Sequence, residues 1–317
     1  MTFVAAFDVD ERKVGADLAK AVQTGNAATT FLDIGHQNVT VSPGMLLDGL
    51  EGNLKGQVTP DPATYDVGPA EVIEVLRESE AEVLVCFLPT GATHAVRSYA
   101  EAAARAGVAF VNGTPEQVAN DPGFQALFAE HNAQLVGDDT RSMVGATTVH
   151  TALIELLRAK GVTTTGTYQI NVGGNMDFLN LADADRSASK VASKRNALSA
   201  AGIDASTVLA GPNGFVGYLG DTKICHLSLE GESILGSRIK IDLRLEVEDS
   251  PNAAGTMIDA VRVVAGARRA GQVGLIAPPC EMLFKSPPTP AAHSEAMANF
   301  DAFVADLDRQ LSRQVDQ

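Results

Sequence analysis

The sequence lacks the residues that mark several classes of protein. Three cysteines, Cys86, Cys225 and Cys280, are scattered through it, and no CxxC pair occurs. Isolated cysteines are typical of reduced thiols in a cytoplasmic protein, not of a disulfide framework. The six histidines form neither HxH nor HExxH, which argues against a zinc site with histidine ligands. No apolar run is long enough to span a membrane, so we expect a cytoplasmic protein with no membrane partner.

Positive charge is also scarce. Lys and Arg total 24 against 39 Asp and Glu, which gives a net charge of −15 at pH 7. A surface that binds nucleic acid or anionic lipid needs concentrated Lys and Arg, so we expect neither partner. An anionic small molecule would need a local basic pocket, and only nine lysines are available to build one.

What the sequence does contain is the pattern of an α/β protein of 317 residues, long enough for two domains or for one with a large insertion. Apolar strands alternate with helices in the first half, which predicts a parallel sheet. The expected strands are Phe3–Phe7, Val83–Leu88, Val108–Asn112 and Ala133–Val136. The expected helices are one carrying Val14, Leu18 and Val22 and capped by Asp10, one at Ala92–Ala106 and one at Ser142–Lys160.

The pattern changes from Thr163 onward. Strands at Thr167–Val172, Lys223–Leu229 and Arg238–Glu248 alternate apolar and polar residues, which indicates an antiparallel sheet with one face in water or in an interface. Helices follow at about Ala253–Ala270 and Glu295–Arg313. We therefore expect a first domain over residues 1–162, an inserted α+β domain over 163–250, and helices over 251–317 that pack back on the first domain.

The stretch from residue 171 to 194 combines several kinds of chemistry. A Gly-Gly pair lets the backbone approach a ligand, and Asn175, Asp177 and Asn180 follow it. Lys190 and Lys194 stand four residues apart, on one face of a helix. Two like charges repel unless an anion lies between them, which suggests a phosphate or oxyanion site. On spacing alone, a simple turn and a solvated helix face are the alternative.

Polar residues also follow the predicted parallel strands at their carboxyl ends, where open sheets bind ligands. They are Asp8, Thr90, Gly91, Asn112 and the pair Asp138-Asp139. A carboxylate such as Asp8 holds the ribose hydroxyls of NAD in nucleotide-binding folds. The glycine-rich loop that normally precedes it is missing here, so either the chain begins one βα unit late or Asp8 is only a turn and capping residue. The paired acids either cap a helix, line a cofactor pocket or hold a cation.

Seven segments in order, across nearly the whole chain, resemble the myo-inositol-phosphate synthases in their shorter bacterial and archaeal form. They are FVAAFDVDERKVGADL at Phe3, LVGDDTRSMVGAT at Leu135, NVGGNMDFLN at Asn171, SKVASK at Ser189, LGDTK at Leu219, EDSPNAAGTMIDAVR at Glu248 and LFKSPP at Leu283. The resemblance implies an α/β fold: a Rossmann-like parallel sheet, N-terminally incomplete, with an inserted α+β domain for catalysis and for assembly of a homotetramer. It also implies isomerisation of D-glucose 6-phosphate to 1D-myo-inositol 3-phosphate, with NAD regenerated in each cycle.

The resemblance assigns roles to individual residues. The catalytic residues would be Lys190, Lys194, Lys223 and Lys285, with Lys194 mainly on the phosphate. Substrate hydroxyls would be oriented by Asn175, Asp177 and Asn180. The cofactor would be held by Asp8, Thr90, Gly91, Asn112, Asp139 and Asp249, with Asp249 also beside a bound cation. Four of the nine lysines fall on these positions, which is why we set the solvated-face alternative aside.

The chain also departs from this family pattern. Arg141 and Met143 stand where bacterial relatives usually have Lys and Gln. Arginine keeps the positive charge but cannot act as an acid near neutral pH. The absent first βα unit has two explanations: the chain begins at an internal Met of a longer reading frame, or it is a short, non-catalytic paralogue that retains a sugar-phosphate pocket. A third alternative, an NAD-dependent sugar-phosphate dehydrogenase, would accumulate NADH.

Overall fold

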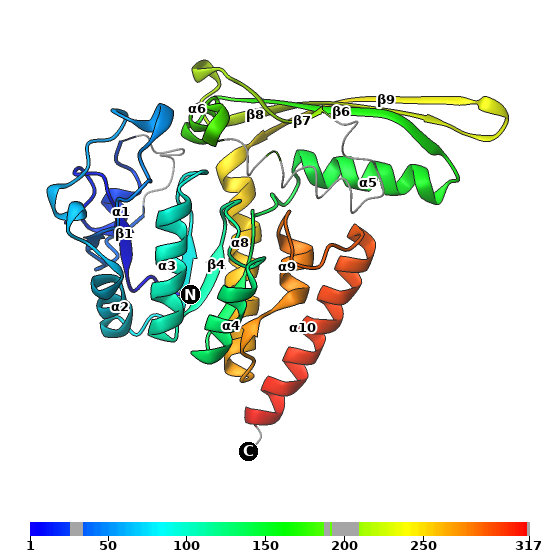
Figure 1. Ribbon diagram of the computed structural model, residues 1–317. Coiled ribbons are helices and arrows are strands. Elements are labelled where there is room, and N and C mark those ends of the chain that lie inside the picture. Colours follow the sequence, from blue (N-terminus) through cyan, green and yellow to red (C-terminus); the bar gives the residue numbers. More distant parts are fainter. Residues whose placement is uncertain (26–33, 187–190, 192–208, 316–317) are drawn as a thin grey trace.

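The computed structural model describes residues 1–25, 34–186, 191 and 209–315. They form a layered α/β body to which a second, elongated sheet is attached (Figure 1). Two of the expected catalytic residues, Lys190 and Lys194, lie outside the described residues. No helix in the described part is long and apolar enough to cross a membrane.

A four-stranded parallel sheet forms the middle layer, with the strand order β10-β5-β4-β3. Its strands are β3 (Val83–Cys86), β4 (Ala109–Asn112), β5 (Gln134–Val136) and β10 (Gly274–Leu275). A separate two-stranded parallel sheet pairs β1 (Ala6–Asp8) with β2 (Val41–Pro43). The parallel arrangement expected from alternating strands and helices is therefore confirmed.

Helices cover both faces of the four-stranded sheet, as the alternate residues of β4 show. Phe110 packs in one apolar cluster, and Ala109 and Val111 pack in another. The helices on the Phe110 side are α2 (Pro69–Glu78), α3 (Thr93–Ala106) and α4 (Pro122–Glu130). Those on the other side are α8 (Asp249–Arg269), α9 (Ala277–Leu283) and α10 (His293–Val315). Burial on both faces explains why this strand is entirely apolar up to its last residue.

The second sheet has the order β7-β6-β8-β9, in which β6 pairs with β7 in parallel and the other pairs are antiparallel. Its strands are β6 (Thr163–Gly173), β7 (Leu209–Phe215), β8 (Thr222–Glu232) and β9 (Arg238–Glu248). Helix α5 (Ala146–Ala159) packs on one face through Ile154 and Leu157. The β8–β9 hairpin reaches far beyond the layered body (Figure 1). The bounds of β9 and its antiparallel pairing agree with the sequence prediction.

Short elements complete the described part. They are α1 (Leu18–Ala21), α6 (Met176–Leu181) and the 3-10 turns Gly52–Leu54, Pro62–Tyr65, Gly217–Leu219 and Ile234–Gly236. The proposed domain limits 1–162, 163–250 and 251–317 stay predictions.

The first helix differs from the sequence prediction. Only residues Leu18–Ala21 are helical, and Asp17, not Asp10, is the N-cap. Gly15 has φ +79°, which no helix interior accommodates. Asp10 instead accepts hydrogen bonds from the backbone and guanidinium nitrogens of Arg12. The helix predicted from apolar residues at every fourth position was therefore wrong in its start, because Gly15 interrupts it.

Candidate active site

A cavity of about 1190 Å³ lies at the carboxyl ends of the parallel strands. Its walls include Asp8 at the end of β1 and Thr90 after β3, together with Lys223 of β8 and Lys285 after α9. Open parallel sheets bind ligands at this edge. Small-molecule pockets usually measure about 300–1000 Å³, so this cavity is larger than an ordinary ligand site.

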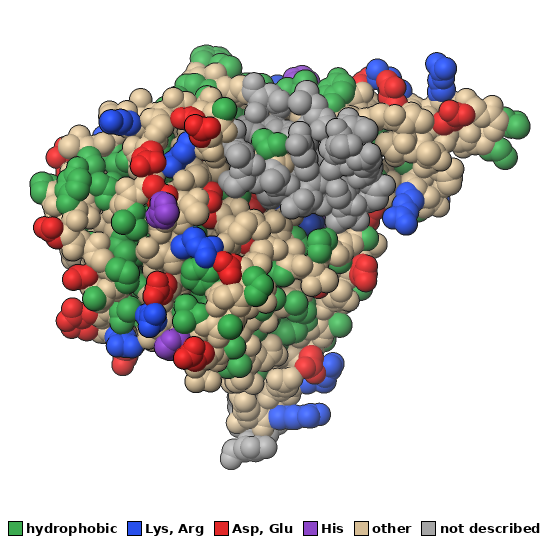
Figure 2. Space-filling model, in the orientation of Figure 1, with side chains coloured by type: hydrophobic (Ala, Val, Ile, Leu, Met, Phe, Trp, Pro, Cys, Tyr) green, Lys and Arg blue, Asp and Glu red, His purple; other side chains and the backbone are tan. Residues whose placement is uncertain are grey.

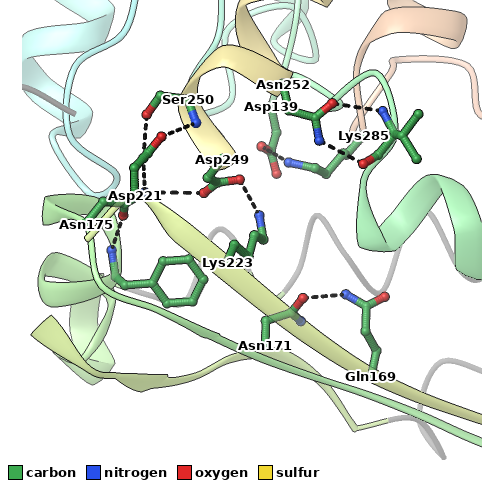
Figure 3. A network of polar contacts seen from close by, with 12 residues as sticks. Asp139, Gln169, Asn171, Asn175, Asp221, Lys223, Asp249, Ser250, Asn252 and Lys285 are labelled. Atoms are coloured by element: carbon green, nitrogen blue, oxygen red, sulfur yellow. Dashed lines mark hydrogen bonds and ion pairs between the residues drawn. The ribbon is translucent and has the colours of Figure 1, made fainter. Parts of the chain in front are cut away.

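The first charged pair in the cavity joins Lys223 to Asp249. The lysine Nζ lies 2.8 Å from the carboxylate Oδ1, and the two side chains are 19% and 16% exposed. The hairpin brings them together, because Lys223 begins β8 and Asp249 follows the end of β9. The Phe178 ring centre lies 5.8 Å from the same Nζ. The largely buried ammonium thus lies beside a carboxylate and near an aromatic ring. Figure 3 shows Lys223 pointing toward Asp249.

Asn175 and Asp221 fix the position of this pair. The Asn175 amide nitrogen donates to Asp221 Oδ1 at 3.1 Å and lies 3.5 Å from Asp249 Oδ2. Its amide oxygen accepts the backbone N–H of Phe178, so Asn175 is also the N-cap of α6. Asp221 further accepts the backbone N–H and the hydroxyl of Ser250. The network ties the start of α8 to the start of α6 (Figure 3).

The second charged pair joins Lys285 to Asp139 at 2.7 Å, with 13% and 4% of the side chains exposed. Backbone bonds hold the two segments in register, since Lys285 N donates to Asp139 O at 2.7 Å and Ser286 N donates to Asp138 O at 3.0 Å. Residues 146 positions apart therefore meet in one rigid junction. The Lys223–Asp249 and Lys285–Asp139 pairs thus line the same cavity.

Asp177 and Asn180 of α6 contact the loop after β3. Thr90 Oγ1 donates to Asp177 Oδ1 at 3.2 Å, and Asn180 Nδ2 donates to Thr90 O at 2.8 Å. Arg186 donates through Nε to Asn180 Oδ1 and through Nη1 to Gly91 O. The structure therefore brings Thr90, Asp177 and Asn180 together at the cavity wall, where their contacts join the loop after β3 to α6. Their roles toward substrate and cofactor stay predictions.

The remaining two residues expected to bind the cofactor differ in placement. Asp8 lines the cavity, and its Oδ2 lies 3.0 Å from Lys13 Nζ. Asn112 is fully buried and donates to Asp138 Oδ1 at 2.7 Å. Its amide oxygen accepts the backbone N–H and the hydroxyl of Thr114. Asn112 thus shapes the loop at Gly113 and Thr114, which lines the cavity, while its own side chain points into the protein.

Arg141 is a further cation of the cavity wall, and its geometry could not be read from the sequence. The side chain is 7% exposed, and Nε donates to Phe284 O at 2.8 Å. Within the described part of the chain, its two terminal amino groups make no hydrogen bond or ion pair. Burial lowers the pKa of Arg141 from its ordinary value, yet an arginine remains charged. A buried guanidinium whose amino groups have no partner among the described residues is suited to an anion.

The N-terminus of α5 lies in the same wall. Its N-cap is Gly145, which offers no side-chain cap to the first N–H groups. The residues of this turn that line the cavity are Ser142, Gly145, Ala146, Thr147 and Thr148. Helix N-termini bind phosphate and carboxylate groups through such N–H groups and the helix dipole. Together with Arg141 this turn forms a candidate anion site.

A metal ion beside Asp249 does not fit the donor set. Among the described residues, no three His, Cys, Asp or Glu side chains lie together so as to hold a metal ion. The Asp249 carboxylate is already paired with the Lys223 ammonium. No step of the reaction is therefore assigned to a cation.

Two further residues of the site, Asp221 and Ser250, stand close in sequence to residues that were expected in it. Asp221 stands two positions before Lys223 in the segment LGDTK, and Ser250 follows Asp249 directly. Their contact needs the hairpin and α8 to meet, which spacing does not reveal. On the face shown in Figure 2, Lys and Arg are scattered singly among Asp and Glu, whereas the cavity is lined by Arg12, Lys13, Arg141, Lys223 and Lys285.

This fold and cavity define an α/β protein with a ligand site between a Rossmann-like sheet and a second, mostly antiparallel sheet. The family model for myo-inositol-1-phosphate synthase matches residues 145–250. The chain is 40% identical to the inositol-3-phosphate synthase of Mycolicibacterium smegmatis, covering 96% of this chain and 85% of that protein. It is 39% identical to that of Corynebacterium glutamicum, covering 95% and 85%. The chain belongs to the inositol-3-phosphate synthase family.

A solved structure agrees with this assignment. The myo-inositol-1-phosphate synthase-related protein of Thermotoga maritima matches with a TM-score of 0.78 and 25% identity, covering 95% of this chain and 86% of that one. The expected family, the Rossmann-like α/β fold class and the membership of an enzyme family are therefore confirmed.

Proposed function

We propose that the chain isomerises D-glucose 6-phosphate to 1D-myo-inositol 3-phosphate, as a step of inositol biosynthesis. The observation that carries this proposal is the pair of lysine–carboxylate contacts, Lys223–Asp249 and Lys285–Asp139, on one cavity with an anion site. The family assignment supports the same reaction.

The phosphate is assigned to the N-terminal turn of α5 and to Arg141. The turn offers backbone N–H groups, and Arg141 offers two amino groups on a guanidinium whose position Phe284 O fixes. Lys190 and Lys194 lie outside the described residues. Their proposed roles, Lys194 at the phosphate and Lys190 at a reacting oxygen, rest on the motif alone.

Lys223 and Lys285 are assigned to the reacting oxygens. The proposed reaction passes through a ketone at C5, an enolate and ring closure onto the C1 aldehyde, so negative charge develops on oxygen more than once. A largely buried ammonium at the cavity wall stabilises such an oxyanion and delivers a proton to it. Asp249 and Asp139 orient the two ammonium groups before substrate arrives. Asn175, Asp177 and Asn180 are assigned to the walls that orient the sugar hydroxyls.

The residues present fit NAD as the cofactor. The cavity exceeds the usual volume of a single small-molecule pocket. Asp8 lies at the end of β1, where a carboxylate accepts hydrogen bonds from ribose hydroxyls, and Thr90, Gly113 and Thr114 line the sheet edge. When bound, NAD would take a hydride from the substrate and return it in the same cycle.

Assembly and location are also proposed. Strand β9 pairs only with β8 among the described residues, so its second edge faces outward. We propose that strands of this sheet join between subunits in a homotetramer, which sedimentation would test. A cytoplasmic location is proposed from the composition of the chain.

The decisive experiment incubates the purified chain with glucose 6-phosphate and NAD, and follows inositol phosphate and NADH absorbance together. We expect inositol phosphate without accumulation of NADH. Accumulating NADH would instead support a sugar-phosphate dehydrogenase. Binding of glucose 6-phosphate with no product of either kind would support a non-catalytic paralogue.

Replacing Arg141 with Met tests the anion site. We expect KM for glucose 6-phosphate to rise about 10- to 100-fold, because a charge-assisted hydrogen bond contributes about 1.5–3 kcal/mol. The change in kcat should be small, since the phosphate does not react. The matched control is Arg244→Met, which removes an exposed guanidinium from β9. An unchanged KM in Arg141→Met would refute the assignment of Arg141 to the phosphate.

A further inference from the structure

The turn formed by residues 142–145, just before α5, is held by little apolar packing. Met143 is 60% and Val144 56% exposed. The turn nevertheless carries part of the proposed anion site, because Ser142, Gly145 and the first residues of α5 line the cavity. Backbone N–H groups bind an anion best when they are held in place before it arrives. Hydrogen bonds must therefore hold this turn.

One residue of α8 makes those hydrogen bonds. Met143 N donates to Asn252 O at 3.0 Å, Val144 N donates to Asn252 Oδ1 at 3.0 Å, and Asn252 Nδ2 donates to Val144 O at 2.8 Å. Figure 3 shows the Asn252 amide with its two hydrogen bonds. The opposite orientation of the amide would set donor against donor and acceptor against acceptor. The amide thus pairs with both polar groups of one backbone residue, as a neighbouring strand does.

These three hydrogen bonds fix three successive peptide planes. A trans peptide group is planar, and its C=O and N–H point in opposite directions. Asn252 holds the N–H of Met143 and both the N–H and the C=O of Val144, which belong to the peptide groups 142–143, 143–144 and 144–145. The N–H of Gly145 lies in the last of these planes, so it points away from Asn252. Gly145 is the N-cap of α5 and lines the cavity.

The same turn of α8 also reaches the other charged part of the site. Asp249, three residues before Asn252, holds the carboxylate that lies 2.8 Å from Lys223 Nζ. One turn of helix therefore connects the lysine assigned to a reacting oxygen with the N–H groups assigned to the phosphate. Asn252 is not among the described residues that line the cavity, so any effect it has on a ligand must pass through the turn that it holds.

We propose that Asn252 is a positioning residue for the phosphate: by holding the turn of residues 142–145, it keeps the N–H groups at the start of α5 aimed at the phosphate of the hexose. This inference rests on the proposed function, because the phosphate is that of the proposed substrate. It deepens that function by assigning the preorganisation of the anion site to a residue outside the cavity. The alternative is that Asn252 only fastens a loop to α8 and contributes to stability alone.

Affinity for inorganic phosphate tests this proposal without turnover. In Asn252→Leu, whose new side chain has a similar size but no hydrogen-bonding group, we expect the affinity measured by calorimetry to fall about tenfold. The reason is that the turn must then be ordered at the moment of binding. Asn252→Ala should give the same loss and serves if Asn252→Leu does not fold. An unchanged affinity in a folded variant would overturn the proposal.

Hydrogen exchange locates the effect in the chain. In the wild type, inorganic phosphate should slow amide exchange at the start of α5, because it occupies the N–H groups there. In Asn252→Leu this slowing should be much smaller. If exchange in the variant is faster without phosphate, but phosphate slows it as much as in the wild type, Asn252 is only a structural residue.

The matched control is Asn299→Leu. It removes an amide of α10 that donates to Glu281 Oε2 at 2.9 Å, and neither residue is among those that line the cavity. Both variants should lower the thermal unfolding midpoint, but only Asn252→Leu should weaken phosphate binding. An equal loss of phosphate affinity in Asn299→Leu would show a general effect of destabilisation and would contradict the proposal.

Comparison with Arg141→Met separates the ways in which this inference can fail. If Arg141→Met weakens phosphate binding and Asn252→Leu does not, the anion site stands and the role of Asn252 is overturned. If neither variant weakens it, or if the wild type binds no phosphate, both assignments fail, and formation of inositol phosphate still decides the proposed function. If phosphate binds but no inositol phosphate forms, the proposed function fails, and the affinities alone decide the role of Asn252.

Discussion

Replacing Lys223 with Met is expected to lower kcat/KM of the proposed isomerisation by about 1000-fold or more. The lysine Nζ lies 2.8 Å from Asp249 Oδ1 in the cavity wall, and a Met side chain fills similar space without a charge or a proton. The variant would lose both the partner of the developing oxyanion and a proton donor. The loss should be mainly in kcat, because these interactions strengthen as charge develops.

Two further variants make this result specific. Lys240→Met removes an exposed lysine of β9, which pairs with Glu230, and should leave kcat/KM unchanged. Lys223→Met/Asp249→Asn also removes the carboxylate that the single variant leaves unpaired, so it separates lost chemistry from a misplaced charge. If Lys223→Met keeps more than about a tenth of the wild-type kcat while folded, Lys223 is not a catalytic residue.

The fold was predictable where the signal was local. The bounds of β9 followed from strict alternation over Arg238–Glu248, and the end of α3 followed from Gly107, which adopts φ +73°. The first helix was not predictable from its apolar spacing, because Gly15 interrupts it. The pairing of β1 with β2 is a contact between distant residues, which the irregular stretch between them gave no reason to expect.

The site was predictable in its residue types but not in its contacts. Lys223, Lys285, Asp139 and Asp249 were each expected in the site, from matching motifs. That they form two ion pairs depends on chain segments meeting in space, 146 positions apart in one case. For Asn112 the sequence showed that it ends a strand, but not that its amide points into the protein. The hydrogen bond from Arg141 Nε to Phe284 O depends likewise on two distant segments meeting in space.

Replacing Asp138 with Asn is expected to have the largest effect on stability, about 3–5 kcal/mol, since it disrupts the hydrogen bonds of a fully buried carboxylate. The carboxylate accepts hydrogen bonds only: from the amides of Asn112 and Asn120 and the backbone N–H groups of Val118, Ala119 and Asn120. An amide in its place would point its NH₂ group at other donors. Urea unfolding measures the loss, with Asp306→Asn, at a half-exposed position, as the control.

The pH dependence of this loss in unfolding free energy shows whether burial or hydrogen bonding dominates the pKa of Asp138. Burial raises the pKa of Asp138 to about 6, although its hydrogen bonds act in the opposite direction. A carboxyl with a raised pKa binds its proton more tightly when folded, so its contribution to stability is complete below its ordinary pKa of about 3.8 and is lost as the pH rises through about 6. The other titratable groups contribute equally to the pH dependence of the wild type and of Asp138→Asn, so their contributions cancel in the difference. The gap in unfolding free energy between the wild type and Asp138→Asn should therefore narrow from pH 4 to 7. A gap that widens instead would show that the hydrogen bonds outweigh desolvation and hold the carboxylate ionised.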